Sequence, residues 1–111
     1  VLRGGAGGSE SQALDYVNQL RARAFGDNSG NIDATALSLQ FVLDERSREL
    51  YWEGFRRTDL IRYGQYTTGS YLWPFKGDVS TGTAVESYRS VFPIPANVIA
   101  VNPNLVQNEG Y

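Results

Sequence analysis

The chain has 111 residues, with 12 acidic and 10 basic side chains and a net charge of −2 at neutral pH. That length suits one small domain, and a content of 41% apolar and 13% aromatic residues is typical of a folded chain. The near-neutral charge argues against a nucleic-acid-binding domain, and no apolar stretch reaches the roughly 20 residues that cross a membrane. Because Cys and His are absent, thiol chemistry, zinc–thiolate sites, the usual general base and the commonest metal ligand are excluded.

The start of the chain looks like the interior of a longer one. There is no Met, and Val1-Leu2 is followed by a glycine-rich stretch from Gly4 to Gly8. A natural chain begins with Met or a processed leader, and neither is visible. We therefore expect Val1-Leu2 to end an upstream helix and the glycines to form a loop, since they lack the Lys-Ser/Thr of a phosphate-binding loop.

The first predicted helix spans about residues 10–25. Ser9 and Gln12 fit a capping box, in which the Ser9 hydroxyl caps the helix and the Gln12 side chain reaches back. Gly26 suits the C-terminal end of this helix. Its apolar face, at three- and four-residue spacing, consists of Ala13, Val17, Leu20 and Ala24.

A second helical tract spans about residues 38–63, and either Asp33 or Ser38 suits its N-cap. Gly in a helix interior costs roughly 1 kcal/mol relative to Ala, so Gly54 is expected to break or kink the tract. The sequence therefore predicts a kinked helical pair, in which the shorter helix runs from Phe55 to Tyr63.

Charged residues are concentrated in this tract, with five of each sign between Leu43 and Arg62. A seven-residue spacing places Arg46 and Glu53 on the same stripe as the leucines. Burying these charges unpaired would cost several kcal/mol, so we expect structural ion pairs that hold two helices together. The expected members are Glu45, Arg46, Glu49, Glu53, Arg56, Asp59 and Arg62.

The acidic residues of the tract allow a second interpretation. Glu45, Glu49 and Glu53 lie on one helical face, and with Asp59 they could include a glycosidase acid and nucleophile. A catalytic acid needs a raised pKa, however, whereas neighbouring Arg residues lower the pKa of a carboxylate. We therefore predict no catalytic residue and no enzyme activity. No Asp-rich loop has the spacing of a Ca or Mg site, so no metal and no cofactor are predicted.

Residues 65–90 lose helical periodicity and are predicted to form an aromatic loop. Tyr71, Trp73 and Phe75 could form a stacking platform, because aromatic faces favour the C–H-rich side of a sugar ring. The alternative is that they cover the two helices as part of the core, since large aromatic side chains are often simply buried. By the same reasoning Trp52 is expected in the core. Tyr71 and Trp73 are the ligand contacts that we put forward.

Residues 92–111 are predicted to form a Pro-rich tail. Phe92-Pro93-Ile94-Pro95 is expected to be extended, because each residue before a Pro is pushed out of the helical region. Pro95 suits the first position of a short helical turn over residues 96–101, which Asn102-Pro103 ends.

The segment from Asp44 to Gly64 closely resembles the signature of the SusD/RagB family, roughly ER-x-x-EL-x-x-EG-x-R-x-x-DL-x-R-x-G. Residues 20–24 (LRARA) and 71–77 (YLWPFKG) resemble family stretches before and after the signature. Three further stretches resemble the usual C-terminal ending of the family, namely Phe92–Pro95, Asn102–Leu105 and Gln107–Tyr111. Two positions depart from the pattern, namely Phe55 in place of a common His and Glu109 in place of a usual Pro.

The resemblance implies a mainly α, SusD-like fold with tetratricopeptide-like helices and long irregular C-terminal loops, of which residues 1–111 are the C-terminal part. Such proteins are outward-facing outer-membrane lipoproteins that bind oligosaccharides or other nutrients without cleaving them. They cap a SusC-type TonB-dependent transporter. The implied partners are therefore a nutrient ligand and this transporter, and membrane contact goes through a lipid anchor outside the segment. The alternative is a purely structural, protein-docking segment with no ligand site of its own.

Overall fold

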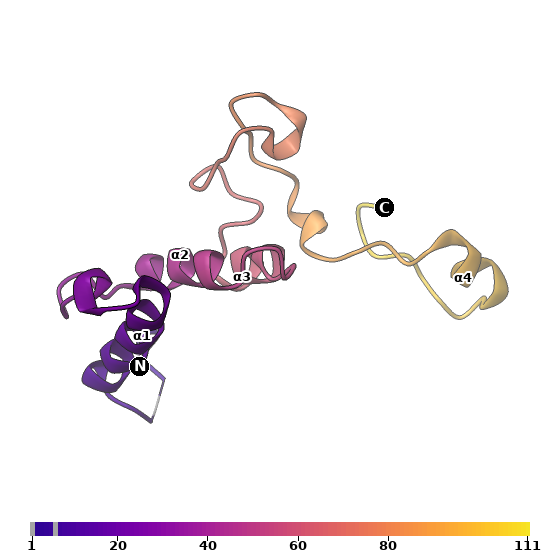
Figure 1. Ribbon diagram of the computed structural model, residues 1–111. Coiled ribbons are helices and arrows are strands. Elements are labelled where there is room, and N and C mark those ends of the chain that lie inside the picture. Colours follow the sequence, from indigo (N-terminus) through magenta and orange to yellow (C-terminus); the bar gives the residue numbers. More distant parts are fainter. Residues whose placement is uncertain (1, 6) are drawn as a thin grey trace. The chain divides into compact units, whose positions relative to one another are not determined.

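The computed structural model describes residues 2–5 and 7–111 (Figure 1). Within these residues the chain forms α-helices and short 3-10 helices and no β-strand, so the prediction of a mainly α chain is confirmed. The expectations for Val1 and Ala6 lie outside the described residues, and Leu2 lies in a turn. The chain divides into two units, residues 1–55 and 56–111, and each is described by itself.

In the first unit, α1 spans Glu10–Phe25, the range predicted for the first helix. The Ser9 hydroxyl accepts a hydrogen bond from the Gln12 backbone N–H (3.2 Å), which satisfies one of the donors left open in a first helical turn. The Gln12 side chain does not complete a capping box, because its amide donates to the Tyr16 hydroxyl (3.3 Å). The helix ends at Gly26, whose φ is 81°.

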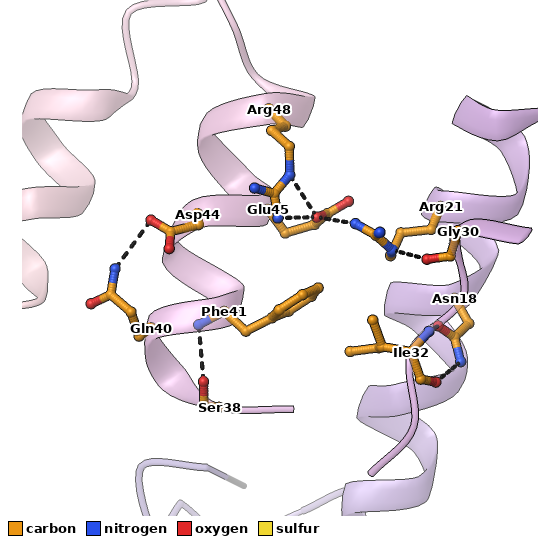
Figure 2. A network of polar contacts seen from close by, with 10 residues as sticks. All are labelled: Asn18, Arg21, Gly30, Ile32, Ser38, Gln40, Phe41, Asp44, Glu45 and Arg48. Carbon is orange, nitrogen blue, oxygen red and sulfur yellow. Dashed lines mark hydrogen bonds and ion pairs between the residues drawn. The ribbon is translucent and has the colours of Figure 1, made fainter. Parts of the chain in front are cut away.

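The segment after α1 folds back along that helix. The Asn18 side-chain amide donates to the Ile32 carbonyl oxygen, and Asn18 Oδ1 accepts from the Ile32 backbone N–H, both at 2.9 Å (Figure 2). A 3-10 helix, η1 (Asn28–Gly30), lies between them. One amide side chain therefore replaces the two hydrogen bonds that a neighbouring strand would supply.

Helix α2 spans Leu39–Glu49 and begins at Ser38 rather than at Asp33. The Ser38 hydroxyl accepts from the Phe41 N–H at 3.0 Å (Figure 2). Asp33 instead stabilises its own turn, because its Oδ1 accepts from the Thr35 backbone N–H at 2.9 Å. Of the two caps that the sequence allowed, the one adjacent to the helix is used.

The helical tract breaks earlier than predicted. Helix α2 ends at Glu49, and turns follow up to residue 55 before the next helix begins at Arg56. Gly54 has a φ of 78°, but Trp52 already lies in the left-handed region at 68°. The break therefore precedes Gly54, because the backbone leaves the helical conformation at residues that carry bulky side chains.

The prediction that Trp52 lies in the core is wrong. Its side chain is 89% exposed, and that of the neighbouring Tyr51 is 75% exposed. The two rings contact each other edge to face, with centroids 6.1 Å apart. The prediction assumed that the buried helical face continued to residue 52, but the helix has ended three residues before it.

Ion pairs join α1 to α2, and Figure 2 shows the one between Arg21 and Glu45. Arg21 Nη1 lies 2.8 Å from Glu45 Oε2, and these side chains are only 15% and 12% exposed. The same carboxylate oxygen accepts from Arg48 Nη2 at 2.7 Å. Closer to solvent, Arg23 Nη2 lies 2.5 Å from Glu49 Oε1. The inner pair is therefore largely withdrawn from water, and the outer pair is not.

The partners of these carboxylates differ from the expected ones. Glu45 and Glu49 pair with Arg side chains of α1, which the sequence reasoning had not considered. Glu53 lies in the turn after α2 and is exposed, so its expected place on a buried stripe is wrong. Asp59 is 2% exposed, and it makes contacts with other groups, as do Arg46, Arg56 and Arg62. That these three arginines pair with the predicted carboxylates stays a prediction.

In the second unit, α3 spans Arg56–Arg62 and α4 spans Ala96–Val101. Between them lie two 3-10 helices, η2 (Lys76–Asp78) and η3 (Ser87–Ser90). Pro95 is the N-cap of α4, with ψ at 136°, one position before the helical place predicted for it. The remainder of this unit is loop, so its backbone groups depend on side chains for many of their hydrogen bonds.

The C-terminal tail folds back on the extended stretch at residues 91–94. Gln107 accepts from the Ile94 backbone N–H (2.8 Å) through Oε1 and donates to the Ile94 carbonyl oxygen (2.9 Å) through Nε2. The Tyr111 hydroxyl donates to the Val91 carbonyl oxygen at 2.9 Å. The tail is thus held by the same kind of amide bridge as the segment after α1.

The inner ion pair should matter more for stability than the outer one. Glu45→Gln removes the charge that Arg21 and Arg48 share, so we expect the free energy of unfolding to fall by about 2 kcal/mol. The matched variant Glu49→Gln alters the pair with the more exposed arginine and should cost less than about 1 kcal/mol. Urea denaturation followed by circular dichroism measures both losses. Equal losses for the two variants would contradict the assignment.

Gly82 should be intolerant of any side chain. Its φ is 79°, and a Cβ there would overlap the Trp73 carbonyl oxygen. A left-handed conformation costs an L-residue about 1–2 kcal/mol, so Gly82→Ala should lower the free energy of unfolding by at least about 2 kcal/mol. Gly69 has no heavy atom within 4 Å of such a Cβ, and Gly69→Ala is the matched control. Urea unfolding of the two variants should separate them clearly; similar values would refute the constraint.

Candidate functional site

Tyr71 and Trp73 lie side by side in the loop between α3 and η2. Their ring centroids are 6.1 Å apart, the ring planes are inclined by 59°, and both side chains are half-buried. Phe75 is 71% exposed and has a φ of 66°. The structure therefore brings together the two residues proposed from the sequence as ligand contacts. That they contact a ligand stays a prediction.

The Tyr71 ring is held by the first residue of α3. Arg56 Nη2 donates a hydrogen bond to the Tyr71 hydroxyl, and the Arg56 guanidinium carbon lies 5.2 Å from the ring centroid. A guanidinium at this distance is attracted to the negative face of an aromatic ring. Arg56 was predicted to belong to an ion-pair network, and the structure adds this aromatic contact.

Lys76 lies at the centre of the loop and is 3% exposed. Its ammonium donates to three carbonyl oxygens, those of Tyr71 (2.6 Å), Thr68 (2.9 Å) and Gln65 (3.4 Å). Nζ also lies 4.8 Å from the centroid of the Trp73 ring. Because an ammonium has three N–H donors, the three carbonyls use all of them.

The surroundings of Lys76 are polar but not acidic, since its hydrogen-bond partners are backbone carbonyls. Burial lowers the pKa of Lys76 below its ordinary value of 10.5, because desolvation penalises the charged form. The same hydrogen bonds satisfy carbonyl groups for which no helix or strand provides a donor. Lys76 therefore orders the backbone from residue 65 to residue 71 and supports the Trp73 ring.

Sequence reasoning did not single out Lys76 as a site residue. The one available signal was compositional, since Lys76 is the only Lys among ten basic residues. A compact ammonium on a flexible stem can direct its donors to three separate carbonyls, whereas the planar guanidinium of Arg is suited to carboxylates. That difference explains why a Lys is used here.

A hollow of about 470 Å³ lies next to this loop, bordered by η2 and η3. Its polar lining includes Asp78, Thr83, Glu86 and Arg89, and its less polar lining includes Tyr66 and Val85. Glu86 Oε2 lies 2.6 Å from Arg89 Nε. The hydrogen bond from Arg89 lowers the pKa of the Glu86 carboxyl, so this carboxylate is ionised at neutral pH.

Two of the carboxylates that could suggest glycoside hydrolysis have structural contacts instead. Glu45 and Glu49 are each bonded to a guanidinium, and this arrangement favours a role in helix packing. Among the described residues, no three His, Cys, Asp or Glu side chains are grouped so that they could hold a metal ion. No helix in the same residues is long and apolar enough to span a membrane.

The burial of Lys76 has a measurable consequence. With lysine 13Cε labelling the chain gives a single side-chain signal, and we expect it to titrate below 10.5 in the folded state. Between the folded and unfolded pKa values the unfolded chain binds more protons, so the contribution of Lys76 to the free energy of unfolding rises with pH. The urea-unfolded chain is the reference. A folded pKa at or above 10.5 would contradict the burial.

The amino-acid sequence matches the SusD family over residues 5–111. The chain is 44% identical over 99 residues to the starch-binding protein SusD of Bacteroides thetaiotaomicron, and the match covers 89% of this chain and 17% of that protein. It is 31% identical over 114 residues to the SusD-like protein P25 of Formosa agariphila, covering 91% of this chain and 20% of that protein. The chain thus spans about a fifth of the length of these relatives.

The family match extends through both units of the structure and includes the signature segment from Asp44 to Gly64. The helices described above agree with the mainly α, SusD-like fold that the signature implied. The resemblance inferred from the sequence is therefore confirmed, and the chain belongs to the SusD family.

Proposed function

We propose that the chain is the C-terminal part of a cell-surface protein that binds a glycan without cleaving it and delivers it to a SusC-type TonB-dependent transporter. The observation that carries this proposal is the 44% identity, over 89% of the chain, to a protein named for starch binding. The protein would face outward from the outer membrane, attached through a lipid anchor outside residues 1–111. The transporter and the glycan are its proposed partners.

In this proposal Tyr71 and Trp73 provide the apolar contact with the ligand. Sugar rings pack their C–H-rich faces against aromatic side chains, and both rings are partly open to solvent. Arg56 and Lys76 hold the two rings in place before a ligand arrives, which lowers the ordering cost of binding. Binding then depends on contacts alone, with no bond broken.

The contacts of Glu45 and Glu49 support a non-catalytic role. A catalytic acid must lie within hydrogen-bond reach of the sugar oxygen that it protonates. Glu45 and Glu49 instead use carboxylate oxygens to bond guanidinium groups of α1. Residues considered as a glycosidase pair are therefore better placed to join helices than to cleave a sugar.

One observation favours the alternative of a purely structural segment. The buried contacts of Lys76 and the ion pair between Arg21 and Glu45 both serve packing. A scaffold or protein-docking role would need no more than these. The two proposals differ in whether this segment binds a glycan and whether that binding needs an aromatic ring of the loop.

Native affinity electrophoresis through gels that contain different polysaccharides tests the proposal. We expect one polysaccharide to retard the chain and Trp73→Ala to abolish that retardation, because the ring supplies the stacking face. Trp52→Ala is the matched control, since it removes an exposed Trp from the other unit. Trp73→Phe keeps an aromatic face and should retain part of the retardation.

No retardation by any polysaccharide would oppose ligand binding by this segment and favour the scaffold alternative. Equal losses for the two Trp variants would oppose the role of Trp73 as a ligand contact. The near-ultraviolet circular dichroism of Trp73→Ala, compared with that of Trp73→Phe, shows whether the loop has kept its structure. Normal binding by a folded Trp73→Ala variant would overturn Trp73 as a ligand contact but would leave glycan binding by the segment in place.

A further inference from the structure

We propose that the hollow bordered by η2 and η3 binds an uncharged sugar residue, whose hydroxyl groups are hydrogen-bonded by Asp78, Thr83 and Glu86. This inference rests on the proposed function, and it adds hydrogen-bonding contacts to the apolar contacts that Tyr71 and Trp73 provide. The hollow has a volume of about 470 Å³, which lies within the usual range of small-ligand sites.

The chemistry of the lining suits a sugar. A sugar residue offers adjacent hydroxyl groups that donate to carboxylates and C–H groups that pack on apolar side chains. Asp78 provides a carboxylate acceptor and Glu86 provides Oε1, beside the Oε2 that is bonded to Arg89. Val85 and the Tyr66 ring provide apolar surface. Asp78 is exposed at the border of the hollow, so a ligand can reach its carboxylate.

The backbone at the border of the hollow is strained. Asp78 has a φ of 63°, which is uncommon for a residue with a side chain. Gly77, with a φ of 65°, precedes it, and a Cβ at Gly77 would lie 2.7 Å from the Thr83 methyl carbon. The chain therefore keeps Asp78 in a costly conformation, and such costs are concentrated at ligand sites.

The hollow and the aromatic pair are joined by one buried residue. The Lys76 backbone N–H donates to the Trp73 carbonyl oxygen, and the Lys76 carbonyl oxygen accepts from the Thr83 N–H, both at 3.0 Å. The Lys76 ammonium lies 4.8 Å from the Trp73 ring centroid. A ligand spanning the aromatic pair and the hollow would therefore meet a surface that a single side chain keeps rigid.

The charges of the lining indicate an uncharged sugar rather than an anionic one. Asp78 and Glu86 are acidic, and the Arg89 guanidinium is already bonded to Glu86 at 2.6 Å. The neighbouring Arg57 guanidinium lies 5.1 Å from the Tyr66 ring centroid and donates to the Arg89 carbonyl oxygen at 2.6 Å. The lining thus carries two carboxylates and one guanidinium, and this negative balance would repel a uronate or a sulfate.

Calorimetric titration of the complete chain tests the inference with two sets of probes. The neutral probes are malto-, cello-, xylo- and manno-oligosaccharides, and the anionic probes are oligosaccharides of alginate and polygalacturonate. Asp78→Gly removes the carboxylate and relieves the left-handed strain, so the fold is retained. We expect the unaltered chain to bind a neutral probe. In Asp78→Gly the affinity for that probe should fall at least tenfold, which corresponds to the loss of about one charge-assisted hydrogen bond. Glu10→Gln, an exposed acidic residue of α1, is the control and should bind normally.

The Trp73→Ala variant separates the inference from the proposal on which it rests. If Trp73→Ala abolishes binding while Asp78→Gly leaves it unchanged, the hollow takes no part and only the inference is overturned. Binding of anionic probes in preference to neutral ones would also overturn the inference alone. If the unaltered chain binds none of the probes, the proposed function fails and the inference fails with it.

Discussion

The second unit depends on the burial of one ammonium group among backbone carbonyls. Residues 65–75 contain no helix or strand, so their carbonyl oxygens need donors that secondary structure does not supply. Lys76 donates to three of them and at the same time lies against the Trp73 ring. The cost of removing its charge from water is accepted because the alternative, several buried carbonyls without donors, would cost more.

The same solution is used elsewhere in the chain with neutral side chains. Asn18 bridges the N–H and the carbonyl of Ile32, and Gln107 bridges those of Ile94. In each case a planar amide offers one donor and one acceptor to a segment that runs beside it. Single side chains can therefore order long loops. At each such position a substitution of similar size that lacks the donor or the acceptor would leave a backbone group of the loop without its hydrogen bond.

The features that could be predicted from the sequence are those that depend on interactions within one short segment. The helix at Glu10–Phe25 follows from a capping Ser9 and a regular apolar spacing, and both lie within one segment. The partner of Glu45 could not be predicted, because Arg21 lies 24 residues away and α2 offers nearer arginines. Trp52 was misplaced because its burial was inferred from a helix that ends before it. The three carbonyl groups that bind the Lys76 ammonium could not be predicted either, because backbone groups of a loop leave no periodic pattern in the sequence.

Two kinds of acidic side chain connect the scaffold with the proposed binding site. Glu45 and Glu49 are bonded to guanidinium groups of α1, so their hydrogen-bonding capacity is spent on packing. Asp78 lies at the border of a hollow on a strained backbone, held in place by the rigid turn around Lys76. A binding protein that breaks no bond needs this second kind of acid, oriented in advance but not neutralised. The family signature contains Glu45 and Glu49, whereas the binding site that we propose lies in a loop outside the signature.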